Sequence, residues 1–357
     1  MRRQHVHDLL QVACSDERLS RDQALTLYTQ AELHELSQAA QAVRRRLHPE
    51  PVVSYVVDRN INYSNICVCG CRFCAFYRAP GQDGGYVLDF LQLKDKIQEA
   101  MDLGATQILL QGSHHPELNL GYYEQMLRAI KEHFPDLHVH GFSPPEIMHF
   151  ASLSGLPPSR VLDRLISAGL GSIPGGGAEI LVDRVRREIA PNKCSAAQWL
   201  EVMDLAHARG LLTTATMMFG HVETLEDRVD HLLAVRDQQD RTHGFTAFIP
   251  WTFQPDNTAL SARKATSIEY LRLVALSRLV LDNVPNLQVS WVTMGAKIGQ
   301  LGLFFGANDF GSTMIEENVV AASGVSFRMS QELMQEVIRE AGFKPRQRRM
   351  DYSLVDL

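Results

Sequence analysis

Apolar and polar positions follow two different rhythms along most of this chain. From about residue 52 onward, short runs rich in β-branched and aromatic residues alternate with longer stretches in which apolar residues recur at three- and four-residue spacing. The first pattern predicts strands, and the second predicts helices that lie on a sheet. We expect strands at Val52–Val57, Thr106–Leu110, Leu137–Phe142, Gly171–Pro174, Leu212–Phe219, Phe245–Pro250, Leu287–Val292 and Leu301–Phe305. We expect helices at Phe90–Leu103, Tyr122–His133, Ser159–Ala168, Ala196–Arg209, Leu225–Gln238 and Ile268–Leu281.

The alternation of strands and helices predicts an α/β fold with a parallel sheet. Eight strands with crossover helices over roughly 250 residues fit a (β/α)8 barrel of the TIM type, and an open doubly wound sheet is the alternative. The barrel is favoured because nearly every expected strand ends in polar or glycine-rich sequence, and the carboxyl ends of barrel strands converge on one mouth. We expect a helical N-terminal extension over residues 1–50, the barrel over 51–312 and a C-terminal extension over 313–357 that packs on the barrel.

Composition and charge exclude several classes of protein. Hydrophobic residues make up 45% of the 357 residues and charged residues 21%, which is the mixture of an ordinary globular enzyme. The net charge of −6 has the wrong sign for a protein that binds nucleic acid through many phosphate contacts. The N-terminus lacks the apolar stretch of a secretory signal, and no apolar run reaches the ~18 residues of a transmembrane helix. We therefore expect a cytoplasmic protein that binds neither nucleic acid nor a membrane.

Four of the six cysteines are clustered, at Cys67, Cys69, Cys71 and Cys74. Cys67, Cys71 and Cys74 form the pattern C-x3-C-x2-C directly after the first expected strand. Three thiolates on one loop can bind three irons of a [4Fe–4S] cluster, and the fourth iron then keeps an open coordination position. The alternative is a structural zinc site with all four thiolates, for which the C-x-C-x-C spacing is unusually tight. We expect Cys69 to lie outside the ligand set.

The cysteine loop and several further motifs resemble those of radical S-adenosylmethionine (SAM) enzymes. The cysteine pattern, with the aromatic Phe73 before the last cysteine, carries the resemblance, which extends over about residues 50–345. More narrowly, other motifs are similar to those of the futalosine branch of menaquinone biosynthesis. These motifs are Asp58–Cys67, Phe73–Arg78, His140–Glu146, Pro174–Ile180, Met217–Glu223, Trp251–Pro255, Ser290–Thr293 and Gly306–Gly311. The motifs Trp251–Gln254 and Ser290–Thr293 favour the cyclase of that branch, with aminofutalosine synthase as the alternative.

The resemblance implies a reaction as well as a fold. It implies that SAM binds the open iron of the cluster and is cleaved to give a 5′-deoxyadenosyl radical. In the family reaction this radical removes the 4′ hydrogen from the ribose of dehypoxanthine futalosine, and the ribose carbon then closes a ring on the benzoate. An electron donor such as a flavodoxin or a ferredoxin is implied as a partner. The protein's part is to position the reactants and exclude water, because the cofactor carries the hard chemistry.

Candidate binding residues lie at the ends of the expected strands and beside the cysteines. A carboxylate after a run of glycines can accept the two hydroxyls of a ribose, and indole rings can stack on a benzoate. The substrate's carboxylate calls for a cation near the cysteine loop. The candidates for SAM are Phe73, Gln111, Ser143 and Glu179. The candidates for the substrate are Arg59, Arg78, Trp251, Gln254, Trp291 and Asn308.

Ring closure also requires a proton acceptor. After the ribose carbon has bonded to the ring, the adduct must lose one proton and one electron, and the acceptor of the proton must lie within hydrogen-bond reach. The candidates at strand ends are His114, His140, Glu146, His221, Glu223 and Asp309. We place Asp309 first, followed by His221 and Glu146. The alternative role for each is to support a neighbouring group or to cap a helix.

Overall fold

The computed structural model describes residues 2–15 and 17–355. Strands and helices alternate from residue 52 onward, as the sequence predicts. The strands are β1 (Val52–Val56), β2 (Asp58–Ile61), β3 (Gln107–Leu110), β4 (His138–Gly141), β5 (Ser172–Ile173), β6 (Leu212–Phe219), β7 (Phe245–Thr252), β8 (Asn286–Leu287), β9 (Asp309–Ser312) and β10 (Lys344–Gln347). The helices are α1 (Arg2–Cys14), α2 (Arg21–Gln30), α3 (Leu33–Leu47), α4 (Phe90–Asp102), α5 (Leu120–His133), α6 (Pro144–Ser154), α7 (Pro158–Ala168), α8 (Asp183–Ile189), α9 (Ala196–His207), α10 (Leu225–Thr242), α11 (Ser267–Val280), α12 (Trp291–Met294), α13 (Ala296–Gly302) and α14 (Gln331–Glu340), with short 3-10 turns η1 (Leu303–Phe305) and η2 (Ala321–Ser323).

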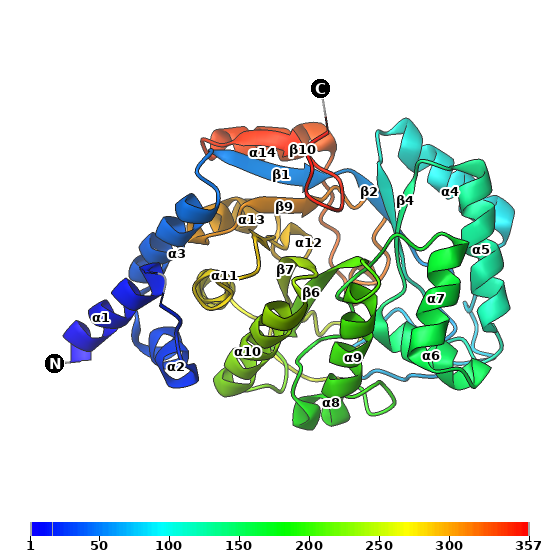
Figure 1. Cartoon of the computed structure of the whole chain (residues 1–357), viewed down its shortest axis with the longest axis horizontal. Coiled ribbons are helices and arrows are strands. Elements are labelled where there is room, and N and C mark those ends of the chain that lie inside the picture. The colour runs from blue at the N-terminus through cyan, green and yellow to red at the C-terminus, as the bar shows by residue number, and fades with distance from the viewer. Residues whose placement is uncertain (1, 16, 356–357) are drawn as a thin grey trace.

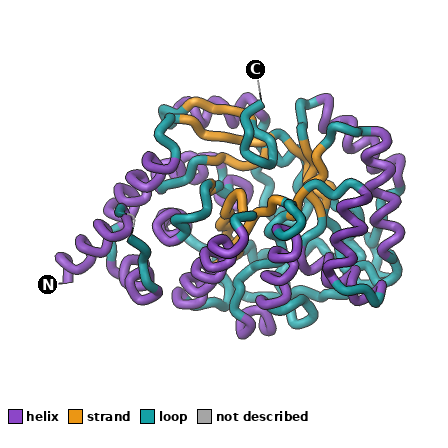
Figure 2. Tube along the Cα trace, in the orientation of Figure 1, coloured by secondary structure: helices purple, strands orange, loops and turns teal. Residues whose placement is uncertain are grey.

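The strands close into a parallel barrel (Figures 1 and 2). From β2 to β8 they are neighbours in chain order in one parallel sheet. Strand β8 is bridged to β9 between Gln288 and Asp309, and β9 pairs in parallel with β1. Strand β1 runs through Val57 directly into β2, so that the two act as one bent strand and the ring is complete. The prediction of a TIM-type α/β fold is confirmed.

Two of the expected strands are wrong in whole or in part. The segment Leu301–Phe305 lies at the end of α13 and in η1, and the last barrel strand is β9 instead. A short apolar run fits a buried helix as well as a strand, so periodicity does not separate the two. The expected strand Leu287–Val292 ends at Leu287, because α12 begins at Trp291.

The sequence also left four helices of the barrel region unpredicted, α6, α8, α12 and α13. Helix α6 follows β4 without a loop, and its start carries two recognised signals: Ser143 at the N-cap and proline in the first turn. We had expected this stretch only as the polar end of a strand. Its early start matters for the site, because it places the first turn of α6 at the mouth of the barrel.

The terminal segments pack on the barrel (Figure 1). Helix α3 lies against α11 and α1, and α2 packs on α10, α11 and α1. After α14, strand β10 pairs in parallel with the outer edge of β1. The chain after β10 then runs beneath the barrel, where Arg348 is buried. The boundaries at residues 50 and 312 stay predictions.

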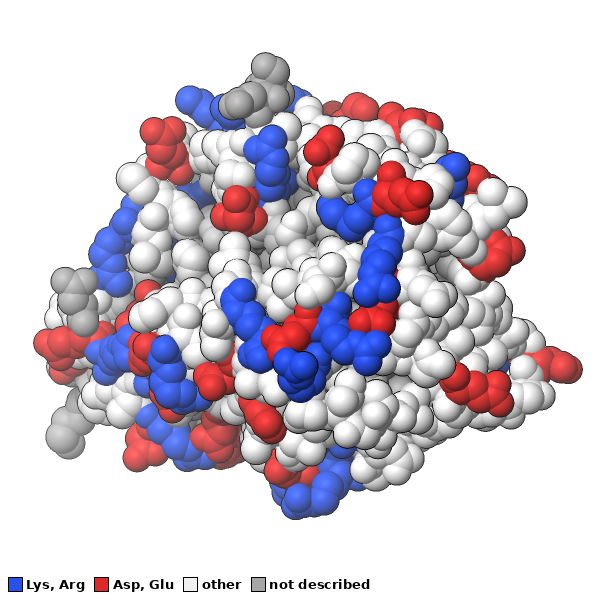
Figure 3. Space-filling view, turned by 45° about the vertical axis from the view of Figure 1, so that its right-hand side comes forward, with Lys and Arg blue, Asp and Glu red and all other residues white. Residues whose placement is uncertain are grey.

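Charge is spread over the surface in both signs. In Figure 3, Lys and Arg side chains lie interspersed with Asp and Glu instead of forming a basic face. Several are paired, including Arg21 with Asp230 and Arg263 with Glu269. In the part of the chain that the structure describes, no helix is both long enough and apolar enough to cross a membrane.

Candidate functional site

The four clustered cysteines lie on the loop that follows β2, at the carboxyl end of the barrel. Arg78 organises this loop: its guanidinium donates to the carbonyl oxygens of Ala75, Phe76 and Tyr77 at 2.9–3.3 Å. Its backbone N–H also donates to Asn65, and its carbonyl accepts from the N–H of Cys67, both at 2.8 Å. Arg78 therefore holds the loop's own backbone, and it does not line the barrel cavity.

The cysteine sulfurs are surrounded by backbone N–H groups. The N–H groups of Cys69 and His114 each approach Sγ of Cys67 at 3.4 Å. Such donors favour the thiolate over the thiol, whereas burial raises the pKa of the Cys67 and Cys74 thiols. Within the described ranges, no three His, Cys, Asp or Glu side chains converge closely enough to hold a single metal ion. The sulfurs of Cys69 and Cys71 lie 3.4 Å apart, and N–H donors toward sulfur suit the thiolate ligands of an iron–sulfur cluster.

Three glycines after β5 allow the chain to approach its neighbours closely. A Cβ on Gly175 would lie 2.6 Å from the carbonyl oxygen of Thr214, and one on Gly176 would lie 2.6 Å from Nε2 of Gln111. Gly177 has a φ of +80°, which favours glycine. Gly175 is required because a side chain would meet the backbone of β6, whereas Gly176 brings the loop against the flexible Gln111 side chain.

Glu179 and Lys193 form a buried ion pair beside the cysteine loop. The Lys193 Nζ lies 2.8 Å from Oε1 of Glu179 and 4.9 Å from the centre of the Phe73 ring. Arg186, which donates to the carbonyls of Gly177 and Ala178, lies 3.8 Å from the other oxygen of Glu179. The expected SAM residues Phe73 and Glu179 are therefore brought together, with a lysine that the sequence did not single out between them.

Glu146 is held by four hydrogen bonds at the start of α6. One oxygen accepts from the Tyr63 hydroxyl at 2.7 Å and from the N–H of Gly112 at 3.0 Å. The other accepts from the N–H and the hydroxyl of Ser143, at 2.8 and 2.6 Å. Glu146 thus ties the loops after β2, β3 and β4 together, and Ser143 is its partner at the helix cap.

His221 and Glu223 pack together after β6. Nδ1 of His221 lies 3.0 Å from Oε2 of Glu223, and Nε2 lies 3.0 Å from the carbonyl of Met218. Glu223 also accepts from both Nε and Nη2 of Arg228 at 2.9 and 2.6 Å. Burial lowers the pKa of His221. Every polar atom of these two side chains has a partner in the barrel wall.

His114, another candidate acceptor, lies behind the cysteine loop. Its ring stacks on that of His149 with centres 4.8 Å apart. Burial, with the charge of His149, lowers its pKa to about 3. The ring is thus a neutral packing element in this structure.

A cavity of about 260 Å³ runs down the inside of the barrel from this mouth, and we call it the lumen. Three of the expected binding residues line it: Gln111, Trp251 and Trp291. Among the candidate proton acceptors, His140 lines it. Its lower part is polar, with Asp58 and Arg348 in the wall. The Trp291 indole is fixed there, since its Nε1 donates to the carbonyl of Ser312 at 2.9 Å.

Three other expected substrate residues point elsewhere. Arg59 pairs with Glu99 and Glu316 on the outer face of β2, whereas Asp58 and Asn60 on either side of it line the lumen. This follows from the alternation of side chains along a strand. The side-chain amides of Gln254 and Asn308 are likewise not in the lumen. Gln254 donates to Thr252, and Asn308 bonds Arg278, Asn286 and the N–H of Leu287.

Asp309 is fully buried and ion-paired with Arg348, which lines the lumen. Its carboxylate accepts from Nε and Nη2 of Arg348 at 2.6 and 3.0 Å. It also accepts from the Ser54 hydroxyl at 2.5 Å and from the N–H of Gly311 at 2.9 Å. Arg348 comes from the segment after β10, so the pair joins β9 to the C-terminal chain.

Sequence reasoning missed Asp58, Lys193 and Arg348. Asp58 could have been found from the period of two in β2, because it shares a face with Asn60. The other two carried no signal of their own. Lys193 follows a short helix, and Arg348 belongs to the basic run Arg346-Gln347-Arg348-Arg349. Only the packing of distant segments brings them to the site.

Two family models match the chain from residue 61 onward. Residues 61–235 match the model described as the radical SAM superfamily, and residues 242–357 match the CofH/MqnC C-terminal region.

Among curated proteins, the cyclic dehypoxanthine futalosine synthase of Halalkalibacterium halodurans is 47% identical over 98% of this chain and 95% of its own length. The synthase of the same name from Streptomyces coelicolor is 45% identical over 96% and 87%. An aminodeoxyfutalosine synthase from Thermus thermophilus is 41% identical over 86% and 84%.

Solved structures share the fold at low sequence identity. The FeFe-hydrogenase maturase HydG from Carboxydothermus hydrogenoformans superposes with a TM-score of 0.75 at 18% identity, over 98% of this chain and 81% of that one. Methylornithine synthase gives a TM-score of 0.74 at 16% identity, over 94% and 97%. At such identities the likeness extends to the fold alone.

Proposed function

The chain belongs to the radical SAM superfamily, in the family that includes the cyclic dehypoxanthine futalosine synthases, and we propose that it is the radical SAM cyclase of the futalosine route to menaquinone. Its reaction converts dehypoxanthine futalosine to cyclic dehypoxanthine futalosine. The identity of 47% over nearly the full length of a synthase of that name carries this proposal. The three-cysteine loop at the mouth of an aromatic-lined lumen supports it.

Cys67, Cys71 and Cys74 would hold the [4Fe–4S] cluster. When bound, the cluster and SAM supply a 5′-deoxyadenosyl radical that can remove hydrogen from a ribose carbon. Arg78 fixes the backbone between the last cysteine and the end of the loop. The N–H groups aimed at Cys67 supply the donors that sulfur ligands of such clusters take.

The SAM site would be formed by Phe73, Gln111, Ser143 and Glu179. The Glu179 carboxylate is a hydroxyl acceptor with a pre-set position, because Lys193 and Arg186 hold it from two sides. The glycine run lets the backbone approach a ligand beside Gln111. Lys193, charged and buried against Phe73, offers a partner for an anionic ligand group there.

The lumen would hold the substrate. Trp251 and Trp291 line it and offer flat faces for the benzoate ring, while the buried wall excludes water. Arg348 also lines the lumen and is the cation we propose for the substrate's carboxylate. Arg59 and Arg78, proposed from the sequence, are each engaged with groups outside the lumen. For Gln254 and Asn308, direct substrate contact would require a rearrangement of their present hydrogen bonds.

Asp309, His221 and Glu146 stay predictions as proton acceptors. Each would have to give up an existing hydrogen bond, because their oxygens or ring nitrogens are already paired. The electron donor and the cytoplasmic location also stay predictions from the sequence. The alternative activity, aminofutalosine synthesis, joins the adenosyl group to the substrate and therefore gives a product of a different mass.

Mass spectrometry of an anaerobic reaction tests the proposal. The reaction contains the reconstituted full chain, a reductant, SAM and dehypoxanthine futalosine. We expect cyclic dehypoxanthine futalosine together with 5′-deoxyadenosine. Cleavage of SAM without the cyclised compound would overturn the substrate assignment and leave the radical SAM chemistry standing. A colourless protein that binds zinc and leaves SAM intact would overturn the enzyme assignment as well.

A further inference from the structure

Two histidines and one serine form a hydrogen-bonded chain in the barrel wall. His138 and His140 lie two residues apart on β4, and Ser172 is the register partner of His140 on β5. The hydroxyl of Ser172 lies 2.6 Å from Nε2 of His138 and 2.6 Å from Nδ1 of His140. Both imidazoles therefore share one hydroxyl group.

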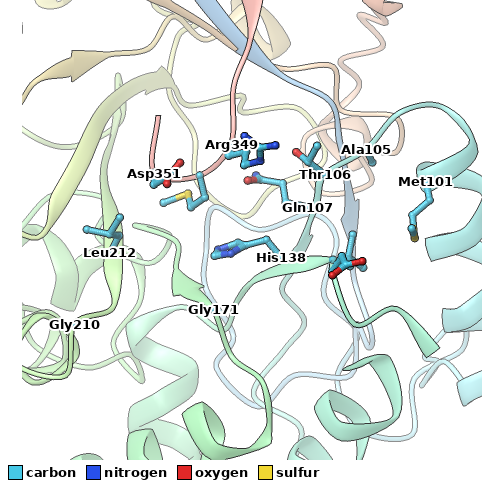
Figure 4. A pocket seen from close by; sticks show the side chains of 13 residues that line it. Met101, Ala105, Thr106, Gln107, His138, Gly171, Gly210, Leu212, Arg349 and Asp351 are labelled. Carbon is cyan, nitrogen blue, oxygen red and sulfur yellow. The ribbon is translucent and has the colours of Figure 1, made fainter. Parts of the chain in front are cut away.

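The two ends of this chain open into different cavities. His140 lines the lumen, and in the described part of the chain its Nε2 has no hydrogen-bond partner. His138 lines a second cavity of about 550 Å³, which lies at the amino ends of β3 to β6 and which we call the outer pocket. Figure 4 shows the His138 ring in that pocket, with Gln107 and Arg349 on the opposite side. Gln107 and Met350 line both cavities and separate them.

The single hydroxyl hydrogen restricts the tautomers of the two rings. Ser172 can donate to only one ring, so the other ring must donate to Ser172. In one state, Nδ1–H of His140 donates to Ser172, which donates to Nε2 of His138. In the other state, all the bonds are reversed. The first state leaves a lone pair on Nε2 of His140 toward the lumen and a hydrogen on Nδ1 of His138. In the second state, Nε2 of His140 carries a hydrogen and Nδ1 of His138 has the lone pair.

The geometry points to a proton relay: His140 accepts the proton of the cyclised adduct, and Ser172 and His138 pass a proton to water in the outer pocket. This inference rests on the proposed cyclase reaction. The C–H bond at the attacked ring carbon breaks and an N–H bond forms at Nε2 of His140. The hydrogen on Nδ1 moves to Ser172, the hydroxyl hydrogen moves to His138, and Nδ1–H of His138 goes to water. The electron would pass to a one-electron acceptor, a role that the iron–sulfur cluster would supply when bound.

The surroundings keep both rings neutral, as the relay requires. Burial lowers the pKa of His140 well below its usual value, and the charges of His138 and Arg348 act in the same direction. Burial also lowers the pKa of His138, with a contribution from Lys131, while Asp351 opposes it. A neutral ring can accept a proton at one nitrogen and release one at the other.

Gly171 fixes the position of His138. A Cβ on Gly171 would lie 2.7 Å from Cε1 and 2.9 Å from Nδ1 of the His138 ring. The ring can therefore reach Ser172 only because residue 171 has no side chain. The sequence predicts Gly171 merely as the start of a strand, so this contact gives it a specific role.

The first test is independent of the reaction. We would record two-bond ¹H–¹⁵N spectra of the full chain labelled at histidine nitrogens, with resonances assigned from His138→Gln and His140→Gln. We expect both rings to populate the same neutral tautomer, or to exchange between the two shared states. Opposite tautomers would overturn the relay, because either both rings or neither ring would then donate to Ser172. Gly171→Ala should uncouple the tautomers by displacing His138.

The second test measures coupling, the amount of cyclised product formed for each 5′-deoxyadenosine during turnover. Ser172→Ala should lower formation of the cyclised product by about 100-fold, in the range of general acid–base effects, while 5′-deoxyadenosine still forms at the parent rate. A lesion of the fold would lower both products together. Ser167→Ala, which removes an exposed hydroxyl from α7, is the matched control and should change neither. An unchanged ratio of the two products in Ser172→Ala would overturn the relay.

Two further variants complete the test: His138→Gly probes rescue by imidazole, and Asp58→Asn probes a rival proton acceptor. His138→Gly leaves a space open to the outer pocket, and added imidazole should restore cyclisation. Asp58 is the rival acceptor in the lumen, since burial raises its pKa. Loss of coupling in Asp58→Asn with normal coupling in His140→Gln would assign the proton to Asp58 and overturn the relay. If the parent chain gave no cyclised product, the proposed function would fall, and the tautomer spectra alone would decide whether the relay exists.

Discussion

Asp309 and Arg348 form a two-bond ion pair in the barrel wall, with Oδ2 to Nε at 2.6 Å and Oδ1 to Nη2 at 3.0 Å. The two residues come from β9 and from the chain after β10. The Arg348 guanidinium also lies over the ring of Tyr352 at 4.0 Å, so the arginine is held on more than one side. Through this pair, the C-terminal segment contributes a cation to the lumen.

Breaking this pair should cost a large part of the stability. Arg348→Met leaves the Asp309 carboxylate buried without its cation, and we expect the free energy of unfolding to fall by about 3–5 kcal/mol. Urea unfolding followed by circular dichroism measures it. Arg349→Met, one residue further along the chain, is the control, and we expect it to stay close to the parent. Equal stability of Arg348→Met and the parent would contradict the importance of the pair.

The cysteine assignment predicts that three cysteine variants lose the cluster and that a fourth keeps it. Cys67→Ala, Cys71→Ala and Cys74→Ala should each abolish cluster loading and SAM cleavage, because each removes one iron ligand. Cys69→Ala should retain both. Iron and sulfide content, the visible absorption spectrum and 5′-deoxyadenosine formation provide the readout. Full iron content and turnover in any of the first three would refute the ligand set.

Gly175 should tolerate no side chain. In Gly175→Ala the new methyl group would meet the carbonyl of Thr214 at 2.6 Å and the backbone of Ala215 at 2.8 Å. We expect an overpacking cost of about 1–3 kcal/mol and weaker SAM binding by equilibrium dialysis. Gly121→Ala is the control: it lies in α5 with only the Asn119 side chain nearby, and helix propensity favours alanine by up to about 1 kcal/mol. Similar losses in both variants would argue against steric crowding.

Acid should destabilise the fold below neutral pH through buried histidines. Burial lowers the pKa of His207 to about 4 and that of His231 to about 3. Since an unfolded histidine titrates near about 6.5, the unfolded state binds more protons below that pH. The contribution of the neutral rings to the free energy of unfolding is thus complete above about pH 6.5. It is lost as the pH falls toward the folded-state pKa values, by up to about 1.4 kcal/mol per pH unit for each ring.

Urea unfolding between pH 7 and pH 4 measures this slope. His207→Gln removes one of the two groups and should flatten the curve by up to about 1.4 kcal/mol per pH unit. His5→Gln, at an exposed position of α1, should leave the slope unchanged. A slope in His207→Gln equal to that of the parent would mean that His207 is not a neutral buried group.

Local sequence was sufficient for the barrel and for the cysteine loop. Strand β6 has the bounds that its pattern predicts, and α4, α7 and α9 lie within a residue or two of theirs. The cysteine spacing was informative because three ligands on one short loop are close in space whatever the rest of the chain does. Leu301–Phe305 was misassigned, since an apolar run of that length fits a buried helix equally well.

The direction of side chains was partly accessible from the sequence. Arg59 could have been assigned to the outer face of β2 from its place between Asp58 and Asn60. Trp251 and Trp291, both substrate candidates from the sequence, line the same lumen. The hydrogen-bond and ion-pair partners of the candidate residues could not be predicted from the sequence in this way. Glu146, His221 and Asp309 stood out as titratable groups at strand ends, yet whether such a group is free depends on donors from other segments.

The sequence by itself therefore determined the architecture and the family, and it predicts the cysteine ligand set, because these depend on periodicity and on residues close together in the chain. Only the tertiary structure decided which charges are paired and which groups share the lumen. Lys193 meets Glu179, Arg348 meets Asp309, and Ser172 joins His138 to His140 across neighbouring strands. Such contacts arise from strand register and from the docking of the C-terminal chain, and neither leaves a local pattern in the sequence.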